Sequence, residues 1–124
     1  MSAEKGKELK TTVDSKANAT QEAWITPTLL NGWVNYDESG YATCQYMKDS
    51  FGIVHVKGMV KGGSQGTAIF NLPAGYRLSK IEYFITSSNN ALGILSTGSS
   101  GNVNANVANT AWVSLRSVSF KAEA

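Results

Sequence analysis

Residues 53–61 read Ile53-Val54-His55-Val56-Lys57-Gly58-Met59-Val60-Lys61, and valine or glycine occupies every second position. This period of two is the spacing of a β-strand with one buried face and one exposed face. We expect the valines and Gly58 to face the core. The mixed face, which carries His55 and Lys57, is expected to face solvent or a partner chain. The stretch therefore predicts a sheet protein.

A sequence pattern typical of β-strands continues along the chain from Trp24 onward. Short runs rich in β-branched and aromatic residues alternate with clusters of Gly, Asn and Ser that mark turns. Several short strands at this spacing are typical of a sandwich or a barrel, and we expect an all-β, antiparallel, jelly-roll-like β-sandwich head over residues 24–124. The expected strands span residues 32–36, 41–48, 51–61, 67–72, 80–87, 91–96, 101–107 and 112–120.

Alternation also suggests which faces of two further strands are buried. The last strand changes parity near Arg116–Ser117, and a β-bulge there would turn four apolar side chains inward. These four are Val113, Leu115, Val118 and Phe120. The apolar sets of the two other strands are Ile81, Tyr83 and Ile85, and Val103, Ala105 and Val107.

Residues 1–23 form a polar leader that differs from the rest of the chain. They hold four Lys, four Asp or Glu, and no aromatic residue. Leu9, Val13 and Ala17 recur at a spacing of four and form one thin helical stripe. The pattern fits a disordered leader, and it equally fits the end of a helical neck in which three chains share the stripe. So short a stripe does not define an oligomeric state.

Composition excludes several classes of function. The net charge is only +2 and the basic residues are scattered, which is unlike the clustered basic face of a nucleic-acid-binding protein. No apolar run reaches the ~18 residues of a membrane-spanning helix. The start has no apolar segment of a secretory signal, so we expect synthesis in a cytoplasm. The single cysteine, Cys44, excludes a disulfide within the chain and is expected to be a small buried hydrophobe or a tolerated thiol.

The residue patterns of an enzyme are mostly missing. His55 is the single histidine and lies in mid-strand. The loop Gly62-Gly63-Ser64-Gln65-Gly66 matches the letters of a nucleophile elbow, but a strand rather than a helix follows it, so we expect a hairpin turn. Cys44 and His55 alone are too few to hold zinc. We therefore expect a protein without catalytic residues, metal or cofactor.

Aromatic and amide side chains are the features that favour ligand binding. Aromatic rings stack on the faces of sugars through the apolar contacts that also anchor protein interfaces. A row of side-chain amides offers donors and acceptors that suit a polyol. Core packing is the alternative for the aromatic residues, and a solvated face is the alternative for the amides. The expected ligand-binding residues are Trp33, Tyr36, Tyr41, Asn102, Asn104 and Asn106.

A set of short motifs follows one order along residues 29–121. The motifs are Gly32-Trp33-Val34, Tyr46-Met47-Lys48-Asp49, Gly52-Ile53-Val54-His55-Val56-Lys57-Gly58, Val60-Lys61-Gly62-Gly63, Ile69-Phe70, Leu72-Pro73-Ala74-Gly75-Tyr76-Arg77 and Trp112-Val113-Ser114-Leu115. As a set, they resemble the C-terminal head of tail-fibre, baseplate and receptor-binding proteins from phages and prophages of Gram-positive bacteria such as Listeria and Bacillus. Leu78 departs from the proline that members often carry at that place.

This resemblance implies a homotrimeric β-sandwich head at the tail tip of a virion. Such a head adheres to a bacterial cell-surface glycan, for example wall teichoic acid, and the neck joins it to other tail or baseplate proteins. The resemblance implies no defined sugar site. Two alternatives stay open: a structural trimerisation tip that binds no ligand, and a hydrolase that degrades wall polymer. The acids weighed for the hydrolase are Asp37, Asp49 and Glu82.

Overall fold

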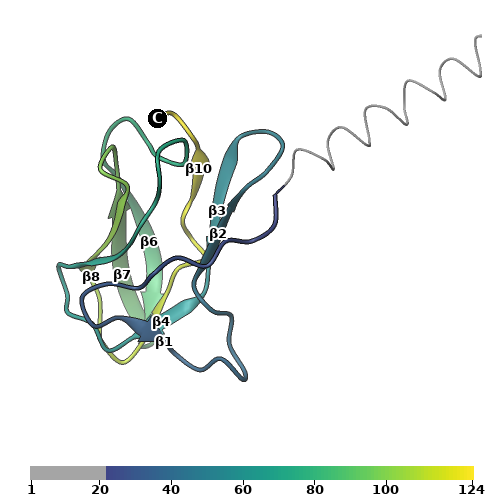
Figure 1. The fold of residues 1–124 in the computed structure, drawn as a ribbon. Coiled ribbons are helices and arrows are strands. Elements are labelled where there is room, and N and C mark those ends of the chain that lie inside the picture. The colour runs from purple at the N-terminus through teal and green to yellow at the C-terminus, as the bar shows by residue number, and fades with distance from the viewer. Residues whose placement is uncertain (1–21) are drawn as a thin grey trace, which may run out of the picture.

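The computed structural model describes residues 22–124, which form ten strands in three antiparallel sheets (Figure 1). The predicted all-β sandwich is confirmed. Residues 22–124 contain no helix, and so none that could span a membrane. The predicted neck of residues 1–23 lies outside the described residues, except for Glu22 and Ala23. The strands are β1 (Val34–Asn35), β2 (Gln45–Lys48), β3 (Ile53–Lys57), β4 (Met59–Lys61), β5 (Ala68–Asn71), β6 (Glu82–Ser88), β7 (Ala91–Thr97), β8 (Asn102–Val107), β9 (Val113–Ser114) and β10 (Ser119–Lys121).

The sheets enclose one hydrophobic core. The four-stranded sheet has the order β5-β8-β7-β6, and the two smaller sheets have the orders β10-β3-β2 and β1-β4-β9. Figure 1 shows β6, β7 and β8 on one side of the head and β2, β3 and β10 on the other. Fully buried side chains come from all three sheets, including Phe70 of β5, Val54 of β3 and Val60 of β4. The core therefore lies between the large sheet and the two small ones.

Two bends join the small sheets into one layer. Strand β3 passes into β4 at Gly58, whose φ is 121°. A Cβ atom at Gly58 would lie 2.6 Å from the backbone of Cys44, so both the conformation and the space require glycine there. A turn connects β9 to β10, and the Val118 amide closes it by donating to the Leu115 carbonyl at 3.2 Å.

These bends explain the two alternation patterns that are confirmed. In β3 and β4, Val54, Val56 and Val60 are buried, and the side chains between them face outward. The parity change at Arg116–Ser117 also turns four apolar side chains inward, as predicted. The change of parity is caused by a turn between strands of different sheets rather than by a bulge within one strand. The four buried residues are Val113, Leu115, Val118 and Phe120.

The alternation in β6 does not mark a buried face. Ile81, Tyr83 and Ile85 are 69%, 68% and 68% exposed, respectively. Phe84 packs against the core, and the two fully inward positions after it are polar because they face backbone carbonyls of the opposite layer. Thr86 Oγ1 donates to the Ser114 carbonyl at 2.6 Å, and Ser88 Oγ donates to the Trp112 carbonyl at 2.9 Å. Buried hydroxyl groups are thus satisfied where methyl groups would leave acceptors unpaired.

Strand β8 departs from its predicted alternation at one end. Val103 and Ala105 are buried as the pattern suggests, but Val107 is 43% exposed. The pairing with β7 shifts between Ile94 and Leu95, so that Ile94 lies opposite Val107 and Leu95 lies opposite Ala105. This irregularity moves Val107 to the outer face of the sheet.

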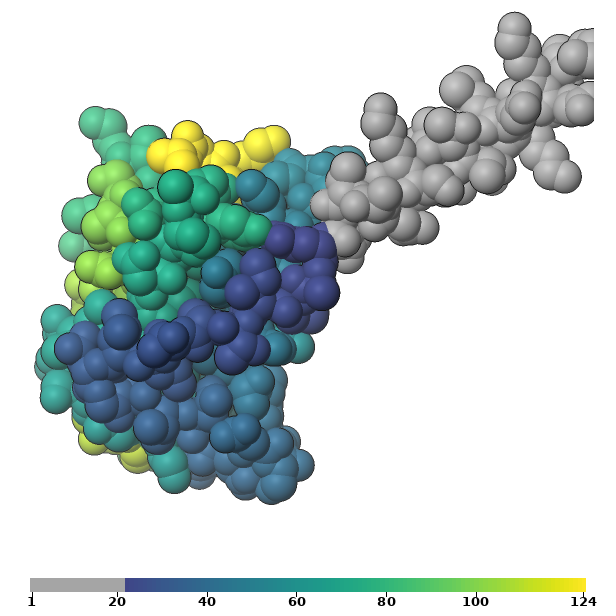
Figure 2. All heavy atoms as spheres, in the orientation of Figure 1, coloured from purple at the N-terminus to yellow at the C-terminus, as the bar shows by residue number. Residues whose placement is uncertain are grey.

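The chain segment before β1 crosses the head as extended chain. Ile25 and Tyr46 exchange two backbone hydrogen bonds of 2.7 and 3.0 Å, and the Leu30 amide donates to Ile69 at 2.8 Å. In Figure 2 this segment, drawn in purple, lies across the face turned to the viewer. It thereby fixes Trp24 beside β2.

Candidate functional site

Two adjoining grooves occur on the layer formed by the two small sheets, one on the outer face of the β10-β3-β2 sheet and one at the bend from β3 into β4. The first, here called the hairpin groove, has a volume of about 320 Å³, and its walls include Trp24, Met47, Asp49, Phe51, His55 and Arg116. The second, the corner groove, has a volume of about 330 Å³, and its walls include Tyr41, Lys57, Gly58, Met59, Ser114 and Arg116. Arg116 lines both grooves, so we treat the two adjoining hollows as one candidate site.

Strand β3 places basic side chains along both grooves. Because its valines face the core, His55 and Lys57 project from the opposite face. The Lys57 ammonium lies 4.4 Å from the centroid of the Trp24 ring, within the range of a cation–π contact. Trp24 lines the hairpin groove and Lys57 lines the corner groove. The contact between Trp24 and Lys57 is therefore a second link between the two grooves, in addition to Arg116.

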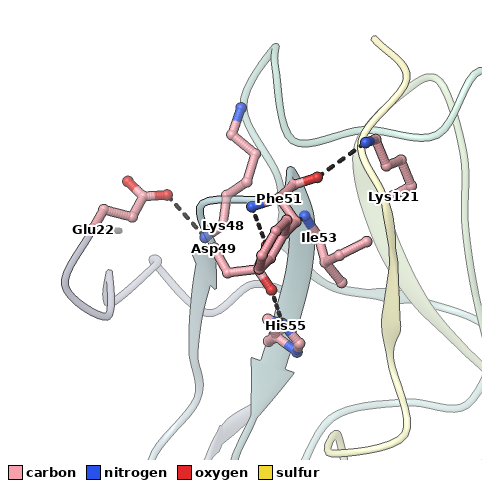
Figure 3. A network of polar contacts seen from close by, with 7 residues as sticks. All are labelled: Glu22, Lys48, Asp49, Phe51, Ile53, His55 and Lys121. Carbon is pink, nitrogen blue, oxygen red and sulfur yellow. Dashed lines mark hydrogen bonds and ion pairs between the residues drawn. The ribbon is translucent and has the colours of Figure 1, made fainter. Parts of the chain in front are cut away.

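Asp49 organises the hairpin that carries one wall of the site (Figure 3). Its Oδ1 atom accepts hydrogen bonds from the amides of Phe51 at 2.9 Å and Ile53 at 3.0 Å. Its Oδ2 atom lies 2.9 Å from Nε2 of His55. The bond to His55, followed by that from the Ile53 amide, lowers the pKa of Asp49 below its usual value. Asp49 therefore stays a carboxylate that orients the imidazole.

Aromatic rings form the rim of the site. Phe51 is 76% exposed and Tyr41 is 49% exposed, and each lines one groove. The Tyr36 ring packs edge-on against Tyr41 with their centroids 5.0 Å apart, and the Lys61 ammonium lies 5.5 Å from the Tyr36 centroid. Of the two tyrosines predicted to bind ligand, Tyr41 thus lines the corner groove, and Tyr36 contacts the Tyr41 ring without lining the groove.

The prediction that Trp33 binds a ligand is wrong. Trp33 is 1% exposed, and its Nε1 atom donates to Thr67 Oγ1 at 3.0 Å. Gly63 packs directly on the ring, since a Cβ atom at Gly63 would fall 2.2 Å from ring atoms. The indole has no face available to a ligand, and it belongs to the core.

The predicted asparagine row lies on the other large face of the head. Asn102 and Asn104 are half-buried on β8, and Asn106 is exposed. The Asn102 Oδ1 atom accepts from Asn71 Nδ2 at 2.8 Å, and Asn106 Oδ1 accepts from Ser96 Oγ at 2.6 Å. The structure therefore separates the asparagines from Tyr36 and Tyr41, and their ligand-binding role stays a prediction.

Several residues of the grooves were not expected as site residues. Alternation alone indicates that His55 and Lys57 face outward, which is the signal that could have identified them. Trp24, Phe51 and Arg116 come from three separate segments, and no local pattern brings them together. Their proximity is a product of the tertiary fold.

The described residues of the two grooves include a single carboxylate, that of Asp49. Glycosidases generally use two carboxyl groups about 5–10 Å apart. Among residues 22–124, Asp49 is the one carboxylate that lines either groove, and it is already bonded to His55 and two amides. In the same part of the chain, no three His, Cys, Asp or Glu side chains gather as a metal site.

Comparison of the chain with known protein families, with curated proteins and with solved structures finds no match.

Proposed function

We propose that this chain is the head of a phage-type tail fibre that attaches reversibly to a glycan on a bacterial surface and catalyses no reaction. The observation that carries the proposal is the pair of adjoining grooves, rimmed by Trp24, Tyr41 and Phe51 and connected by Lys57 and Arg116. The motif resemblance supports the same function. Of the acids weighed for a hydrolase, only Asp49 lines a groove.

The chemistry of the grooves fits a polymer that carries both sugar rings and anionic groups. Exposed aromatic rings stack on the apolar faces of sugars. Charge-assisted hydrogen bonds from guanidinium and ammonium groups bind phosphate oxygens. Within residues 22–124, the His55–Asp49 contact is the one salt bridge, so Lys57 and Arg116 have no acidic partner in the described chain. Both cations are available to an anionic wall polymer such as teichoic acid.

Weak single sites are sufficient for adhesion when several act together. In the proposed arrangement, three heads form one fibre at the tail tip of a virion, and the neck joins the fibre to other tail or baseplate proteins. A second site on the same particle then meets its ligand at a high effective concentration. Each groove can therefore release and rebind while the particle stays attached.

The test is binding of the fluorescently labelled chain to cell walls from a panel of Gram-positive strains, before and after chemical removal of teichoic acid. We expect strain-selective binding that removal of the polymer abolishes. Trp24→Ala and Arg116→Gln should each weaken binding by at least about fivefold, the size of a modest interface hot spot. Lys80→Gln removes one positive charge from a residue that lines neither groove, and it should bind as the wild type does.

Absence of binding to every wall, from a sample shown to be folded, would exclude adhesion and favour the structural trimerisation tip. Equal binding by wild type and by both groove variants would exclude this site. One observation favours the structural tip as a second role: a large apolar surface is exposed on the sheet opposite the grooves.

A further inference from the structure

The outer face of the four-stranded sheet carries most of the exposed apolar side chains of the head. Ile81, Tyr83 and Ile85 before and along β6, Leu92 of β7 and Val107 of β8 are between 43% and 69% exposed. They are neighbours across the sheet as well as along it. Ile85 pairs with Ile94, and Ile94 pairs with Val107. Contiguous apolar patches on soluble proteins mark interaction surfaces.

Strand β6 leaves one edge of this sheet open. It is seven residues long, and among the described residues it pairs only with β7. Natural proteins usually protect an edge strand with charges, proline, a bulge or short length. In β6 the one charged residue is Glu82, at the start of the strand. The apolar face therefore adjoins a strand edge without charged residues beyond Glu82, and β9 packs beside β6 through the Thr86–Ser114 hydrogen bond.

We infer that this face, from Tyr83 and Ile85 to Val107, is the surface on which copies of this chain pack against one another. The inference rests on the oligomeric part of the proposed function, but it does not depend on glycan binding. It assigns to self-association the outer face of the four-stranded sheet, whose exposed apolar residues line neither groove.

The charge distribution fits a second copy as the occupant. The outward rows of β6, β7 and β8 consist of apolar, hydroxyl and amide side chains, without a charged residue. Two such faces can meet without like-charge repulsion, and protein interfaces are depleted of charge at their centres. The grooves carry the cations Lys57 and Arg116, so two copies of that face would bring like charges together. A charged partner would find no counter-charge on the apolar face.

The shape and the polar border of the face also suit self-contact. Ile85 and Leu92 line an open hollow of about 710 Å³ that extends to Ser114 of β9, which also lines the corner groove, and the lining of the hollow holds no charged residue. Protruding apolar side chains of a second copy can enter it. Asn102 and Asn104 border the patch on β8, and their amides both donate and accept hydrogen bonds. The same row on a copy is therefore a chemically matched partner.

The test is the mass of the full chain in solution, measured by light scattering over a range of concentrations. We expect an oligomer for the wild type. Ile85→Glu and Leu92→Glu place a carboxylate on the patch and in the hollow, respectively, and each should yield monomers. Both residues are largely exposed, so the fold should persist, which circular dichroism verifies. Phe51→Glu makes the same change at a 76% exposed residue of the hairpin groove and should leave the oligomer intact.

A monomeric wild type at every concentration, or an Ile85→Glu oligomer as stable as the wild type, would overturn the inference. Dissociation caused by Phe51→Glu would also overturn it, because the contact would then lie at the grooves. The monomeric variants should bind multivalent cell walls at least about 100-fold more weakly while their single sites are unchanged. An oligomer that binds no wall would remove the adhesion function and leave this interface in place.

Discussion

The amide of Leu115 donates a hydrogen bond of 2.8 Å to the carbonyl oxygen of Gly58. This bond ties the bend between β3 and β4 to the end of β9. The residues next to the two partners, Lys57 and Arg116, are the two cations that connect the grooves. The spacing of these cations therefore depends on backbone geometry at the bends rather than on contacts between the side chains themselves.

Replacement of Gly58 should show how strictly this geometry is required. Gly58→Ala places a Cβ atom 2.6 Å from the Cys44 backbone at a φ of +121°, and we expect it to lower the free energy of unfolding by about 3 kcal/mol or more. Gly66→Ala is the matched control, since Gly66 has a φ of +87° and nothing within 4 Å of the added atom. It should cost only about 1–2 kcal/mol. Urea denaturation measures both, and equal losses would show that the close approach at Gly58 is unimportant.

Cys44 should be chemically inert in the folded protein. It is 1% exposed, and burial raises the pKa of its thiol to about 12. Since the thiolate is the reactive form, a thiol reagent at pH 8 should label native protein only at the rate at which the structure opens. Labelling in denaturant should be complete and rapid. Fast labelling of the native protein would show that the β2 side of the core opens readily.

Substitutions at Trp33 and Trp24 should have different effects on folding stability and on binding to cell walls. Trp33→Ala removes a fully buried ring and should lower the free energy of unfolding by about 3–5 kcal/mol. Trp33→Phe keeps most of the packing, so it should bind cell walls as the wild type does. Trp24→Ala changes a groove wall and should affect binding far more than denaturation. Loss of wall binding by a well-folded Trp33→Phe variant would show that Trp33 does contribute to ligand binding.

These contrasts also show what the sequence could predict. The period of two along β3 is sufficient to orient Val54 and Val56 inward, because a strand at the centre of a small sheet has one side of core and one side of solvent. In β6 the same rule fails, since the inward side faces carbonyl groups that need the hydroxyls of Thr86 and Ser88. The alternation of residue types along a strand shows which side chains share a face. Which of the two faces is buried depends on the layer that packs against the strand.

The candidate site was harder to predict than the fold. A tryptophan beside a turn has the same sequence context whether its ring is buried or exposed, and for Trp33 the deciding contact is Gly63, which is distant in the chain. Arg116 enters the grooves only because a turn redirects the chain between β9 and β10. The positions of such side chains depend on contacts between segments that are distant in the sequence. Patterns within one segment carry no information about these contacts.

Asp49 should control the shape of the hairpin through its Oδ1 atom. Asp49→Asn keeps an oxygen acceptor for the amides of Phe51 and Ile53, whereas Asp49→Ala leaves both without this partner. At pH 6 we expect a small decrease in melting temperature for the first variant, which loses the carboxylate charge beside His55, and a larger decrease for the second. The pKa of Asp49 is lowered in the folded state, so its contribution to stability is present above the unfolded pKa of about 3.8 and is lost as the pH falls below that value. Melting curves from pH 6 to pH 2 measure this loss, which Asp49→Asn should reduce.

Tyr76 should make the head sensitive to alkaline pH. Its hydroxyl donates to both carboxylate oxygens of Glu22 at 2.6 and 2.7 Å, and this bond, with burial, raises the pKa of Tyr76 from 10.0 to about 12. Folding therefore favours the protonated phenol. The stabilisation is fully present below pH 10 and is lost as the pH rises from about 10 to about 12. Tyr76→Phe removes the titrating group, so it should be less stable than the wild type at pH 8 and should lose less stability between pH 10 and pH 12. All other side chains are the same in both proteins, so the difference between the two melting series isolates Tyr76. Parallel series would show that Glu22 does not hold this hydroxyl in solution.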